Sequence, residues 1–405
     1  MIEKKDNCTG CMACIDACPT KCIKPIEDEK GFLYPEVQIE KCIHCKKCDT
    51  VCPIQKQNEI LIEKALFYAA RNKDIEIQRS SSSGGVFTAF AESIIENKGY
   101  VFGGGWKNNS VSPIEIKNKT ELESVRRSKY VQSNCVGIYK KIEEKLKQGN
   151  EVLFTGTPCQ VNALSRYINP SLKKNLYLIE LVCHGVPSPN VWKKYIQLLN
   201  RKFNKQNKAI KFIQFKYKDG KKYYWNHPGF RIVWDDDTEY VDFSNNTWYE
   251  NGYLGNLFVR PSCYNCHFKQ LATKADITIG DFWGCEKLYP DFFDKNGVSV
   301  IAVNSLKGKQ MFNNVQNNLY FIQISKEDAI KYNQRFIRST KPSVKSKKFW
   351  KEYLNKQERD SMSYDYVETL VNKCLKQSTF DRCILLLRKK FGKLKRKLII
   401  ITGKK

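Results

Sequence analysis

The feature that most constrains this chain is a cysteine motif that occurs twice in its first 58 residues. Each copy reads C-x2-C-x2-C-x3-C-P, and the second copy lies 34 residues after the first. The cysteines are Cys8, Cys11, Cys14 and Cys18 in the first copy and Cys42, Cys45, Cys48 and Cys52 in the second. Three closely spaced thiolates can surround one face of an iron–sulfur cubane, while the fourth cysteine points away and ligates the other cluster. The motif therefore predicts two [4Fe–4S] clusters.

The spacing also assigns ligands to each cluster. The predicted sets are Cys8, Cys11, Cys14 and Cys52 for one cluster and Cys18, Cys42, Cys45 and Cys48 for the other. Zinc is the alternative metal for soft thiolates, but zinc sites usually show two C-x-x-C pairs instead of a repeated triplet with C-P. Over about 50 residues the pattern resembles the bacterial two-cluster ferredoxins. Cys22 is surplus, and we interpret it as a packed or free thiol.

Composition places this motif in a globular protein of a reducing compartment. The 405 residues are 41% hydrophobic and 12% aromatic, which is enough for two or three domains with cores. We expect no signal peptide, because no apolar segment precedes Cys8, and no membrane span, because no apolar run approaches about 18 residues. A cytoplasmic location follows. The 17 cysteines then indicate metal or redox chemistry more than disulfides.

Positive charge is concentrated at the C-terminus. Residues 1–58 carry nine basic and nine acidic residues, whereas residues 340–405 carry nineteen basic and six acidic ones, a net +13 out of +27. Within 384–403, apolar residues at helical spacing alternate with Lys and Arg, which predicts a basic amphipathic helix. It could dock on the body or on a partner subunit, or contact the anionic inner face of a membrane. No nucleic-acid-binding motif is present, so we expect no nucleic-acid partner.

The body, 62–335, repeats a strand, a small-residue loop and a helix. "EVLF" precedes "TGTPCQVNAL", "LYLIELV" precedes "CHGVPSPNVWKKYI", and "ADITIG" precedes "DFWG". Such units predict an α/β sheet with ligands bound beyond the carboxyl ends of the strands. If these strands are neighbours, Cys159, Cys183 and Asp281 converge. "FKYKDGKKYYWNHPGFRIVW", 215–234, predicts a hairpin around Asp219-Gly220.

An isolated C-x-x-C pair in the body lacks two ligands. Cys263 and Cys266 would complete a third [4Fe–4S] site with Cys159 and Cys183. Cys285 is a rival fourth ligand, and a zinc site at the pair is the other metal alternative. The remaining cysteines have no partner pattern and are interpreted as structural: Cys135, Cys374 and Cys383.

Two further segments suggest anion binding. In "RSSSSGGVFTAF" a Ser/Gly loop leads into a helix from about Val86, and free amides at Gly84, Gly85 and Val86 would cradle an anion, with Ser82 and Ser83 as donors. An N-capped helix with a flexible lead-in is the alternative. "RRSKYVQS", 126–133, is either a solvated basic face or a phosphate or carboxylate clamp. His184 and His227 are weaker candidates for proton transfer.

Together these motifs resemble the coenzyme F420 hydrogenase/dehydrogenase β-subunit family, over roughly residues 1–335. They are the tandem cysteine repeat, "SSSSGGVFTAF", "RSKYVQS", "GTPCQVNAL", "LVCHGVPSP", "CYNCHFK" and "ADITIGDFWG". The resemblance implies an iron–sulfur flavoprotein that passes electrons between FAD and [4Fe–4S] clusters, often with a deazaflavin as hydride partner. It implies cluster ligands at Cys159, Cys183, Cys263 and Cys266. Its implied flavin site comprises Ser82, Ser83, Gly84, Gly85, Lys129, Gly156 and Thr157.

The sequence therefore predicts an α+β protein: a ferredoxin-like 2[4Fe–4S] domain, an α/β flavin- and cluster-binding body, and a basic helical tail. The expected divisions are 1–58, 62–140 with the flavin site, 141–335 with the third cluster, and 336–405. The predicted function is FAD-dependent iron–sulfur oxidoreduction between a two-electron substrate or redox partner protein and the clusters, in the setting of surface-polysaccharide biosynthesis that the resemblance suggests. The alternative is a non-catalytic electron-transfer subunit of a larger redox complex. No catalytic acid or base is assigned.

Overall fold

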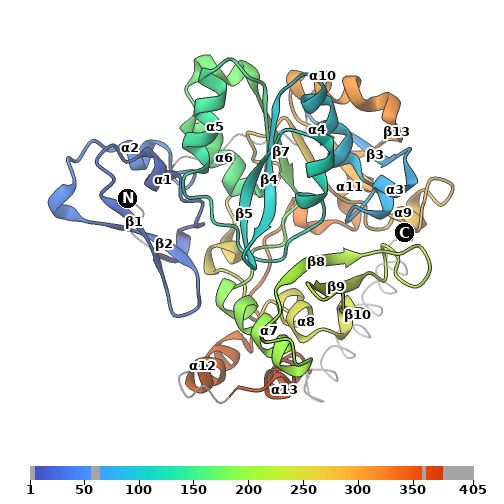
Figure 1. The fold of residues 1–405 in the computed structure, drawn as a ribbon. Coiled ribbons are helices and arrows are strands. Elements are labelled where there is room, and N and C mark those ends of the chain that lie inside the picture. Colours follow the sequence, from blue (N-terminus) through green and yellow to red (C-terminus); the bar gives the residue numbers. More distant parts are fainter. Residues whose placement is uncertain (1–4, 56–63, 358–361, 377–405) are drawn as a thin grey trace, which may run out of the picture.

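The N-terminal domain is small and built around its cysteine loops. The computed structural model describes residues 5–55, 64–357 and 362–376. In the domain, β1 (Ile23–Glu27) and β2 (Leu33–Val37) form an antiparallel pair. Two short helices, α1 (Ala13–Ala17) and α2 (Lys47–Thr50), follow the cysteine loops and pack on each other. The domain lies to one side of the body in Figure 1.

One mixed sheet of eight strands organises the body. Its order is β13-β3-β12-β11-β7-β6-β4-β5, in which β4, β6, β7 and β11 are parallel and the other neighbours are antiparallel. The strands are β3 (Leu66–Asn72), β4 (Tyr100–Lys107), β5 (Ser110–Ile116), β6 (Val152–Gly156), β7 (Leu176–Leu181), β11 (Ile277–Asp281), β12 (Ser299–Val303) and β13 (Leu319–Ile324). The continuous apolar strands β6 and β12 are buried at every position, as expected for a sheet covered on both faces.

Helices cover both faces of this sheet, because alternate residues of a strand point to opposite sides. Val101 and Leu153 pack with α4 (Val86–Glu96) and α10 (Leu306–Val315) on one face. Phe102 and Phe154 pack with α5 (Ile138–Lys147) and α6 (Pro158–Tyr167) on the other. The short helices α3 (Ile75–Arg79), α9 (Cys285–Leu288) and α11 (Lys326–Lys331) lie toward the β3–β12–β13 side (Figure 1).

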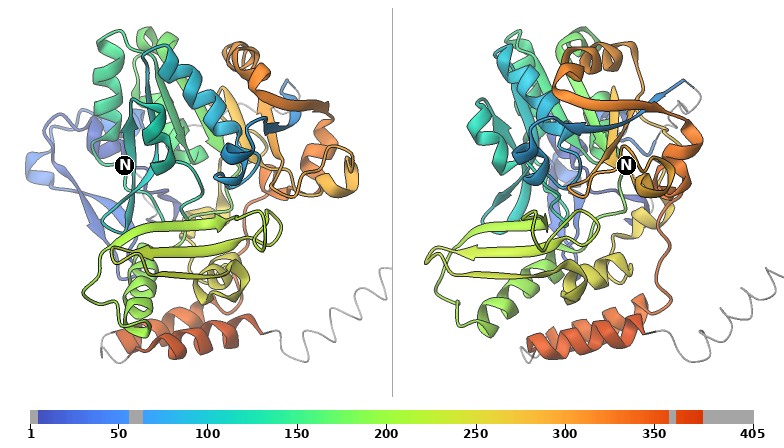
Figure 2. Two further views of the ribbon diagram at one scale, coloured as in Figure 1. Left: turned by 45° about the vertical axis from the view of Figure 1, so that its right-hand side comes forward. Right: turned by 90° about the vertical axis from the view of Figure 1, so that its right-hand side faces the viewer.

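A second layer lies beneath the large sheet in Figure 2. It contains an antiparallel sheet of β8 (Ile210–Tyr217), β9 (Gly229–Trp234) and β10 (Glu239–Phe243). The helices are α7 (Pro189–Lys202), α8 (Trp248–Leu254), α12 (Ser346–Gln357) and α13 (Tyr364–Leu375). Their shared core is aromatic: Trp192, Trp234 and Trp248 are each 1% exposed. Burial of such large rings is the main stabilising contribution in this layer.

The sequence-based expectations for the body agree with these elements. The three strand–loop–helix units begin with β6, β7 and β11, which are adjacent in the sheet. The hairpin predicted over 215–234 is β8–β9, with Asp219 accepting the amides of 221–223 in the connecting loop. Strands from both sides of the expected boundary at residue 140 share the large sheet, and the division into ranges stays a prediction.

The described part of the tail is helical and packs on the body. α12 and α13 contribute Phe349, Tyr353 and Leu370 to the aromatic core. The amphipathic helix predicted over 384–403, and Cys383, lie outside the described residues. No helix in the described ranges has the length and apolarity needed to cross a membrane.

Candidate iron–sulfur and cofactor site

The carboxyl ends of β6, β7 and β11 bring two of the predicted cluster ligands together. β6 pairs in parallel with β7, and β7 with β11, so their C-terminal loops open on one edge of the sheet. Cys159 follows β6 and Cys183 follows β7. This convergence was predicted conditionally from the sequence, and the strand order confirms the condition.

Local capping fixes where Cys159 lies. Thr157 is the N-cap of α6, its amide donates to Gln160 Oε1 at 2.9 Å, and Pro158 occupies the first helical position. Such a capping box with proline holds the entry to a helix in one conformation. Cys159 is therefore in the first turn, with its Sγ 3.2 Å from Thr157 Oγ1.

The four cysteines of the predicted third cluster are neighbours in space. Burial raises the pKa of Cys159, and the charges of Cys183 and Cys266 raise it further. Burial likewise raises the pKa of Cys263, with contributions from Cys183, Cys159 and Cys266. Such mutual repulsion among buried thiolates is costly without cations to bind them. The four side chains are half-buried, and the arrangement therefore suits a metal cluster in the wall of the body.

Backbone contacts and one lysine hold this group. The amide of Cys263 donates to Arg260 O at 3.0 Å, and the amide of Cys266 donates to Ser339 Oγ at 3.0 Å. Lys269 Nζ donates to Cys183 O at 2.7 Å and lowers the pKa of the Cys183 thiol, although burial raises that pKa overall. A fixed ammonium beside the group favours thiolates over thiols.

The three other described cysteines of the body have different surroundings. Cys285, the rival ligand, is fully buried in the apolar core around Phe282 and α9. Cys135 is buried and accepts from Gln160 Nε2 at 3.1 Å. Cys374 packs in the aromatic core through α13. Cys285 and Cys374 are thus packed in apolar cores, and Cys135 is held by the residue that follows Cys159. The interpretation of these three as structural thiols stays a prediction.

The predicted ligands Cys8, Cys11, Cys14 and Cys52, here called the first ferredoxin set, are also close together. Burial raises the pKa of Cys11, and Cys14, Cys8 and Cys52 each raise it further. A small cavity of about 30 Å³ is lined by all four of these cysteines, together with Cys48 and neighbouring residues. The predicted set includes Cys52 from the second copy of the motif, and the structure places Cys52 with this group.

The predicted ligands Cys18, Cys42, Cys45 and Cys48, here called the second ferredoxin set, lie near Cys22. Cys18 Sγ lies 3.3 Å from Cys22 Sγ, and the charge of Cys42 contributes to the raised pKa of Cys22. Cys42 and Cys48 pack against Cys18 and Cys22. Cys22 is therefore a packed thiol next to this set, as interpreted from the sequence. Cys45 is exposed at its outer side.

Among the described residues, no three His, Cys, Asp or Glu side chains converge as one bound metal ion would require. In a [4Fe–4S] cluster each thiolate binds a different iron, so the four ligands stand farther apart than the ligands of one ion. The ligand assignments themselves stay predictions.

A cavity of about 580 Å³ lies beside the third cysteine group. Its walls include Cys183 and most of the residues of the predicted flavin site. Those residues are Ser82, Ser83, Gly85, Lys129, Gly156 and Thr157. The volume is in the range of cavities that hold cofactors and drug-sized ligands. Segments that are far apart in the sequence thus form one site next to the cysteines.

The Ser/Gly loop differs in part from the expectation. The Gly84 amide donates to Ser299 Oγ at 3.0 Å, so the prediction of a free amide there is wrong. A Cβ on Gly84 would lie 2.6 Å from Ala70 O, so glycine at this position serves close packing. Gly85 has a φ of +81° and precedes α4, and it lines the cavity with Val86 and Phe87. The start of α4 therefore faces the cavity together with the serines of the loop, whereas Gly84 does not line it.

The serines of this loop are anchored by their neighbours. Ser82 Oγ accepts the Ser128 amide at 2.7 Å, and the Ser83 hydroxyl donates to Val298 O at 3.1 Å. The first contact joins the Ser/Gly loop to the segment that carries Lys129. The flexible lead-in considered from the sequence is therefore a fixed loop.

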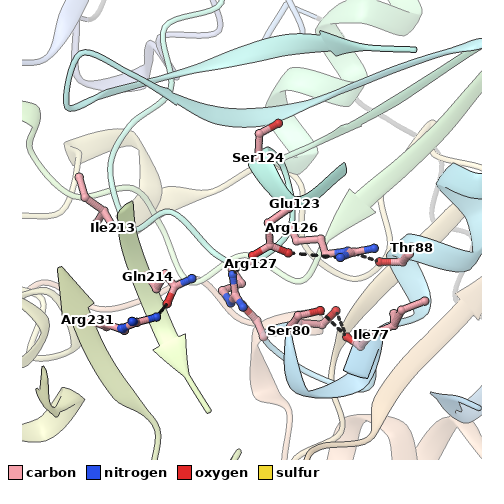
Figure 3. Close-up of polar contacts among 12 residues, drawn as sticks. Ile77, Ser80, Thr88, Glu123, Ser124, Arg126, Arg127, Ile213, Gln214 and Arg231 are labelled. Carbon is pink, nitrogen blue, oxygen red and sulfur yellow. Dashed lines mark hydrogen bonds and ion pairs between the residues drawn. The ribbon is translucent and has the colours of Figure 1, made fainter. Parts of the chain in front are cut away.

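The segment "RRSK" lines the cavity and is not a solvated face. The side chains of Arg126 and Arg127 are 15% and 11% exposed. Both reach Glu123, and Arg126 Nε also donates to Thr88 Oγ1 at 3.1 Å, as Figure 3 shows. Because Thr88 belongs to α4, this network fixes the arginines relative to the helix start. The arginines are thus fixed at the cavity by Glu123, and the clamp interpretation stays a prediction.

Lys129 points back to its own segment. Its Nζ donates to Arg127 O at 3.2 Å and to Arg126 O. Burial, with a smaller contribution from Arg127, lowers the pKa of Lys129 to about 7. Its charge is therefore sensitive to an anion in the cavity, which would raise that pKa.

Sequence reasoning missed an ion pair and an aromatic platform at the same cavity. Lys216 of β8 pairs with Asp281 at the end of β11, and Trp225 Nε1 donates to Asp281 Oδ1 at 2.7 Å. Trp225 stacks on Trp283 with ring centroids 4.6 Å apart, and Trp283 is 40% exposed. Only the position of Asp281 at a strand end was a usable signal in the sequence.

Two further charged groups were missed. Glu250 of α8 is 2% exposed, and burial raises its pKa to about 8. Lys218 is buried behind the Ser/Gly loop and donates to Gln78 O at 2.9 Å, Ser83 O at 3.0 Å and Asn296 O. Burial lowers the pKa of Lys218 to about 7. Lysines and glutamates are common in surface segments, so neither residue could be selected from sequence pattern.

His184 is tied into the wall beside Cys183. Its Nε2 lies 2.7 Å from Asn256 Oδ1, and burial lowers its pKa to about 4. It is therefore neutral near pH 7. His227 also lines the cavity.

Comparison with known proteins matches both halves of this arrangement. Residues 7–56 match a 4Fe–4S dicluster domain, and residues 149–329 match the family described as the C terminus of the coenzyme F420 hydrogenase/dehydrogenase beta subunit. Two uncharacterised proteins of Methanocaldococcus jannaschii resemble the N-terminal domain. A ferredoxin is 36% identical over 63 residues, which are 16% of this chain and 77% of the relative. A polyferredoxin-like protein is 38% identical over 58 residues, which are 12% of this chain and 34% of the relative.

Among solved structures, a chain of the F420-reducing [NiFe] hydrogenase complex from Methanosarcina barkeri, in a xenon derivative, is similar at a TM-score of 0.45 and 16% identity. The match covers 69% of this chain and 91% of that chain. Likeness at this level does not establish function. The two domain matches do establish composition: this chain is an iron–sulfur protein with an N-terminal 4Fe–4S dicluster domain, and its residues 149–329 form a domain related to the C terminus of the coenzyme F420 hydrogenase/dehydrogenase beta subunit.

Proposed function

We propose that the 580 Å³ cavity binds FAD, and that the protein moves electrons between a two-electron substrate and its [4Fe–4S] clusters through that site. One observation carries this proposal. Cys183 belongs to the third cysteine group and also lines the cavity. A group bound in the cavity would therefore share a wall with the cluster that these cysteines would hold.

The residues of the cavity fit a flavin dinucleotide in charge. The lining holds five basic residues and two acidic ones: Arg126, Arg127, Lys129, Lys216 and Arg335 against Glu250 and Asp281. A net positive lining suits a diphosphate. The amides at the start of α4 add donors of the type that bind phosphate at helix N-termini.

Unpaired polar groups and an apolar surface in the cavity lining also suit a bound flavin. Thr155 Oγ1 and Arg127 Nε belong to residues that line the cavity and are buried with no hydrogen-bond partner among the described residues. Buried polar atoms are rarely left unpaired, so these two are candidates to bind a ligand. The exposed ring of Trp283 supplies apolar contact for a planar system.

A bound flavin would supply the exchange between two-electron and one-electron chemistry that neither clusters nor hydride donors perform alone. The chain itself would bind and orient it. Arg126 and Arg127 would fix the anionic end, and the buried wall of β6 and β7 would exclude water near Cys183. No strong acid or base is required of the protein, because hydride transfer depends mainly on positioning and electrostatics.

The two-electron partner is proposed by class only. A deazaflavin or another hydride carrier is consistent with the cavity's positive lining and with Trp283 as a stacking surface. The setting in surface-polysaccharide biosynthesis rests on the sequence resemblance alone.

Anaerobic purification with iron, sulfide and flavin counted per chain tests the proposal. We expect about 12 iron atoms and one FAD, which correspond to three [4Fe–4S] clusters and one flavin. About 8 iron atoms without flavin would overturn the proposal. That outcome would support the alternative of a non-catalytic electron-transfer subunit, with Cys263 and Cys266 as a structural or zinc pair.

A further inference from the structure

The three cysteine groups form a series with a defined order. Arg260 Nε donates to the carbonyl oxygen of Cys8 in the first ferredoxin set at 2.8 Å, and Arg260 O accepts the amide of Cys263 in the third group at 3.0 Å. The first ferredoxin set is therefore next to the third group, which adjoins the cavity. Tyr139 reinforces the junction, because its hydroxyl donates to Cys11 O at 2.7 Å. The second ferredoxin set lies beyond the first.

Packing of the helices agrees with this order. α1, between Cys11 and Cys18, packs on α5 and α6 of the body and on α2. Figure 1 shows α1 between the body helices and α2. The segment 42–48, which carries three cysteines of the second set, is thus on the outer side of the N-terminal domain.

Exposure singles out one cysteine of the second set. Cys45 is exposed, whereas Cys18 of the same set is buried and the cysteines of the other two groups are buried or half-buried. The run 38–47 around Cys45 is exposed at every position except Cys42. Among the twelve predicted ligands, the fully exposed one is therefore Cys45 of the second set.

The surface at this end has a distinct composition. We call residues 38–47 the exit patch. Ile39 and Ile43 are each 63% exposed, and Lys41, Lys46 and Lys47 accompany them with one acid, Glu40. A small apolar centre with charges around it is typical of weak, transient interfaces such as those of electron carriers. The lysines favour an acidic partner.

We propose that the exit patch is the docking surface for a small acidic one-electron carrier protein of the flavodoxin or ferredoxin type. This rests on the proposed function, since it takes the cavity as the two-electron end. One hydride equivalent brings two electrons and a proton. The two electrons reduce two carrier molecules by one electron each, and the proton is released to solvent. The reverse direction has the same balance.

The test uses the full chain, purified anaerobically with its iron counted, and an acidic flavodoxin and an acidic [2Fe–2S] ferredoxin as probes. The triple variant K41E/K46E/K47E reverses the charge of the exit patch without touching a cysteine. We expect its Kd for both carriers to rise at least about tenfold at low salt, and the difference to shrink at high salt. A basic cytochrome c should show the opposite change.

The matched control reverses three exposed lysines of the body, K107E/K193E/K309E. It has the same net charge and should change the Kd less than about twofold, because these residues belong to β4, α7 and α10 of the body and not to the exit patch. A second variant, I39S/I43S, should weaken binding at all salt concentrations. If the variant K41E/K46E/K47E loses iron, the variant I39S/I43S still tests whether the exit patch binds the carrier.

Several outcomes would overturn the proposal. Equal loss in the control variant would show a non-specific charge effect. Unchanged binding by both patch variants would place the carrier elsewhere. Flotation of the full chain with anionic vesicles that is lost in K41E/K46E/K47E, without carrier binding, would assign the patch to a membrane. A chain with iron and FAD but no carrier binding refutes only the exit patch, whereas a chain without iron refutes the proposed function as well.

Discussion

At the scale of single residues, the cavity depends on buried charges whose roles follow from their partners. Lys218 illustrates this, because all three of its acceptors are backbone carbonyls and one belongs to Ser83 in the Ser/Gly loop. It does not line the cavity but holds the loop that does. A buried ammonium with three acceptors is costly to replace, since each carbonyl would lose its donor.

Lys218→Met should loosen the Ser/Gly loop and weaken flavin binding. We expect the Kd for FAD to rise about tenfold, which is about 1.4 kcal/mol. Fluorescence titration of the flavin-free protein measures it. Lys221→Met, an exposed lysine of the same hairpin, is the control and should leave the Kd unchanged. Equal affinity in both variants would contradict the positioning role of Lys218.

Glu250 should make stability depend on pH. Burial raises its pKa to about 8 from an ordinary 4.5, so between these values the folded state holds a proton that the unfolded state has lost. Stability from this group is therefore present below pH 4.5 and falls as pH rises to 8. In Glu250→Gln that loss is absent, a relative gain of about 2–4 kcal/mol by pH 8.

The measurement is the Tm of both proteins from pH 5 to 8. The Tm difference between Glu250→Gln and the wild type should grow with pH. Glu286→Gln, at an exposed glutamate, is the control and should follow the wild type. A constant difference would mean that Glu250 is already ionised in the folded protein.

At the scale of elements, one arginine joins the N-terminal domain to the body. Arg260 is fully buried and donates to Cys8 O at 2.8 Å and Leu33 O at 3.0 Å across the junction, and to Gln132 Oε1 at 3.0 Å. Its guanidinium also lies over the Tyr34 ring at 4.2 Å. Asp16 adds a second link, since it accepts the Gly137 amide at the start of α5 at 2.7 Å. These contacts keep the first ferredoxin set against the third group.

Arg260→Met should loosen this junction by leaving buried carbonyls without donors. We expect a loss of about 2–4 kcal/mol in the free energy of unfolding. Hydrogen exchange should localise it to faster exchange in β1–β2. Arg231→Met, which breaks a partly exposed pair with Glu239, should cost less than about 1 kcal/mol. Unchanged exchange in β1–β2 would show that the domain is held by other contacts.

At the scale of the whole molecule, the iron content should divide along the three cysteine groups. Cys159→Ala removes a ligand of the proposed third cluster and should lower the iron count from about 12 to about 8 per chain. The buried thiol Cys285 is the control, because it lies in the core around α9. Cys285→Ala should keep about 12 iron atoms. Loss of all iron in Cys159→Ala would contradict independent groups.

The N-terminal domain could be predicted from the sequence more completely than the body. The cysteine repeat has fixed local spacing, so it identified the ferredoxin domain and placed Cys52 with the other copy of the motif. In the body, the repeated pattern of an apolar strand, a small-residue loop and a helix identified β6, β7 and β11. Pro and Gly beside Cys159 and Cys183 indicated that their loops face the site. The sequence did not predict the order of these strands, so the convergence of Cys159 and Cys183 could only be stated as conditional on that order. Pairing between distant strands leaves little trace in one sequence.

The sequence by itself determined the electron-carrying chemistry, because cluster ligation depends on residue type and on spacing within a few residues. Tertiary structure alone decided which group adjoins which, that Cys183 lines the cavity, and that Cys45 is exposed. It also decided the roles of Lys218, Glu250 and Gly84. The physical reason is that burial, pKa and proximity depend on contacts between segments separated by up to hundreds of residues, and no local pattern records such contacts.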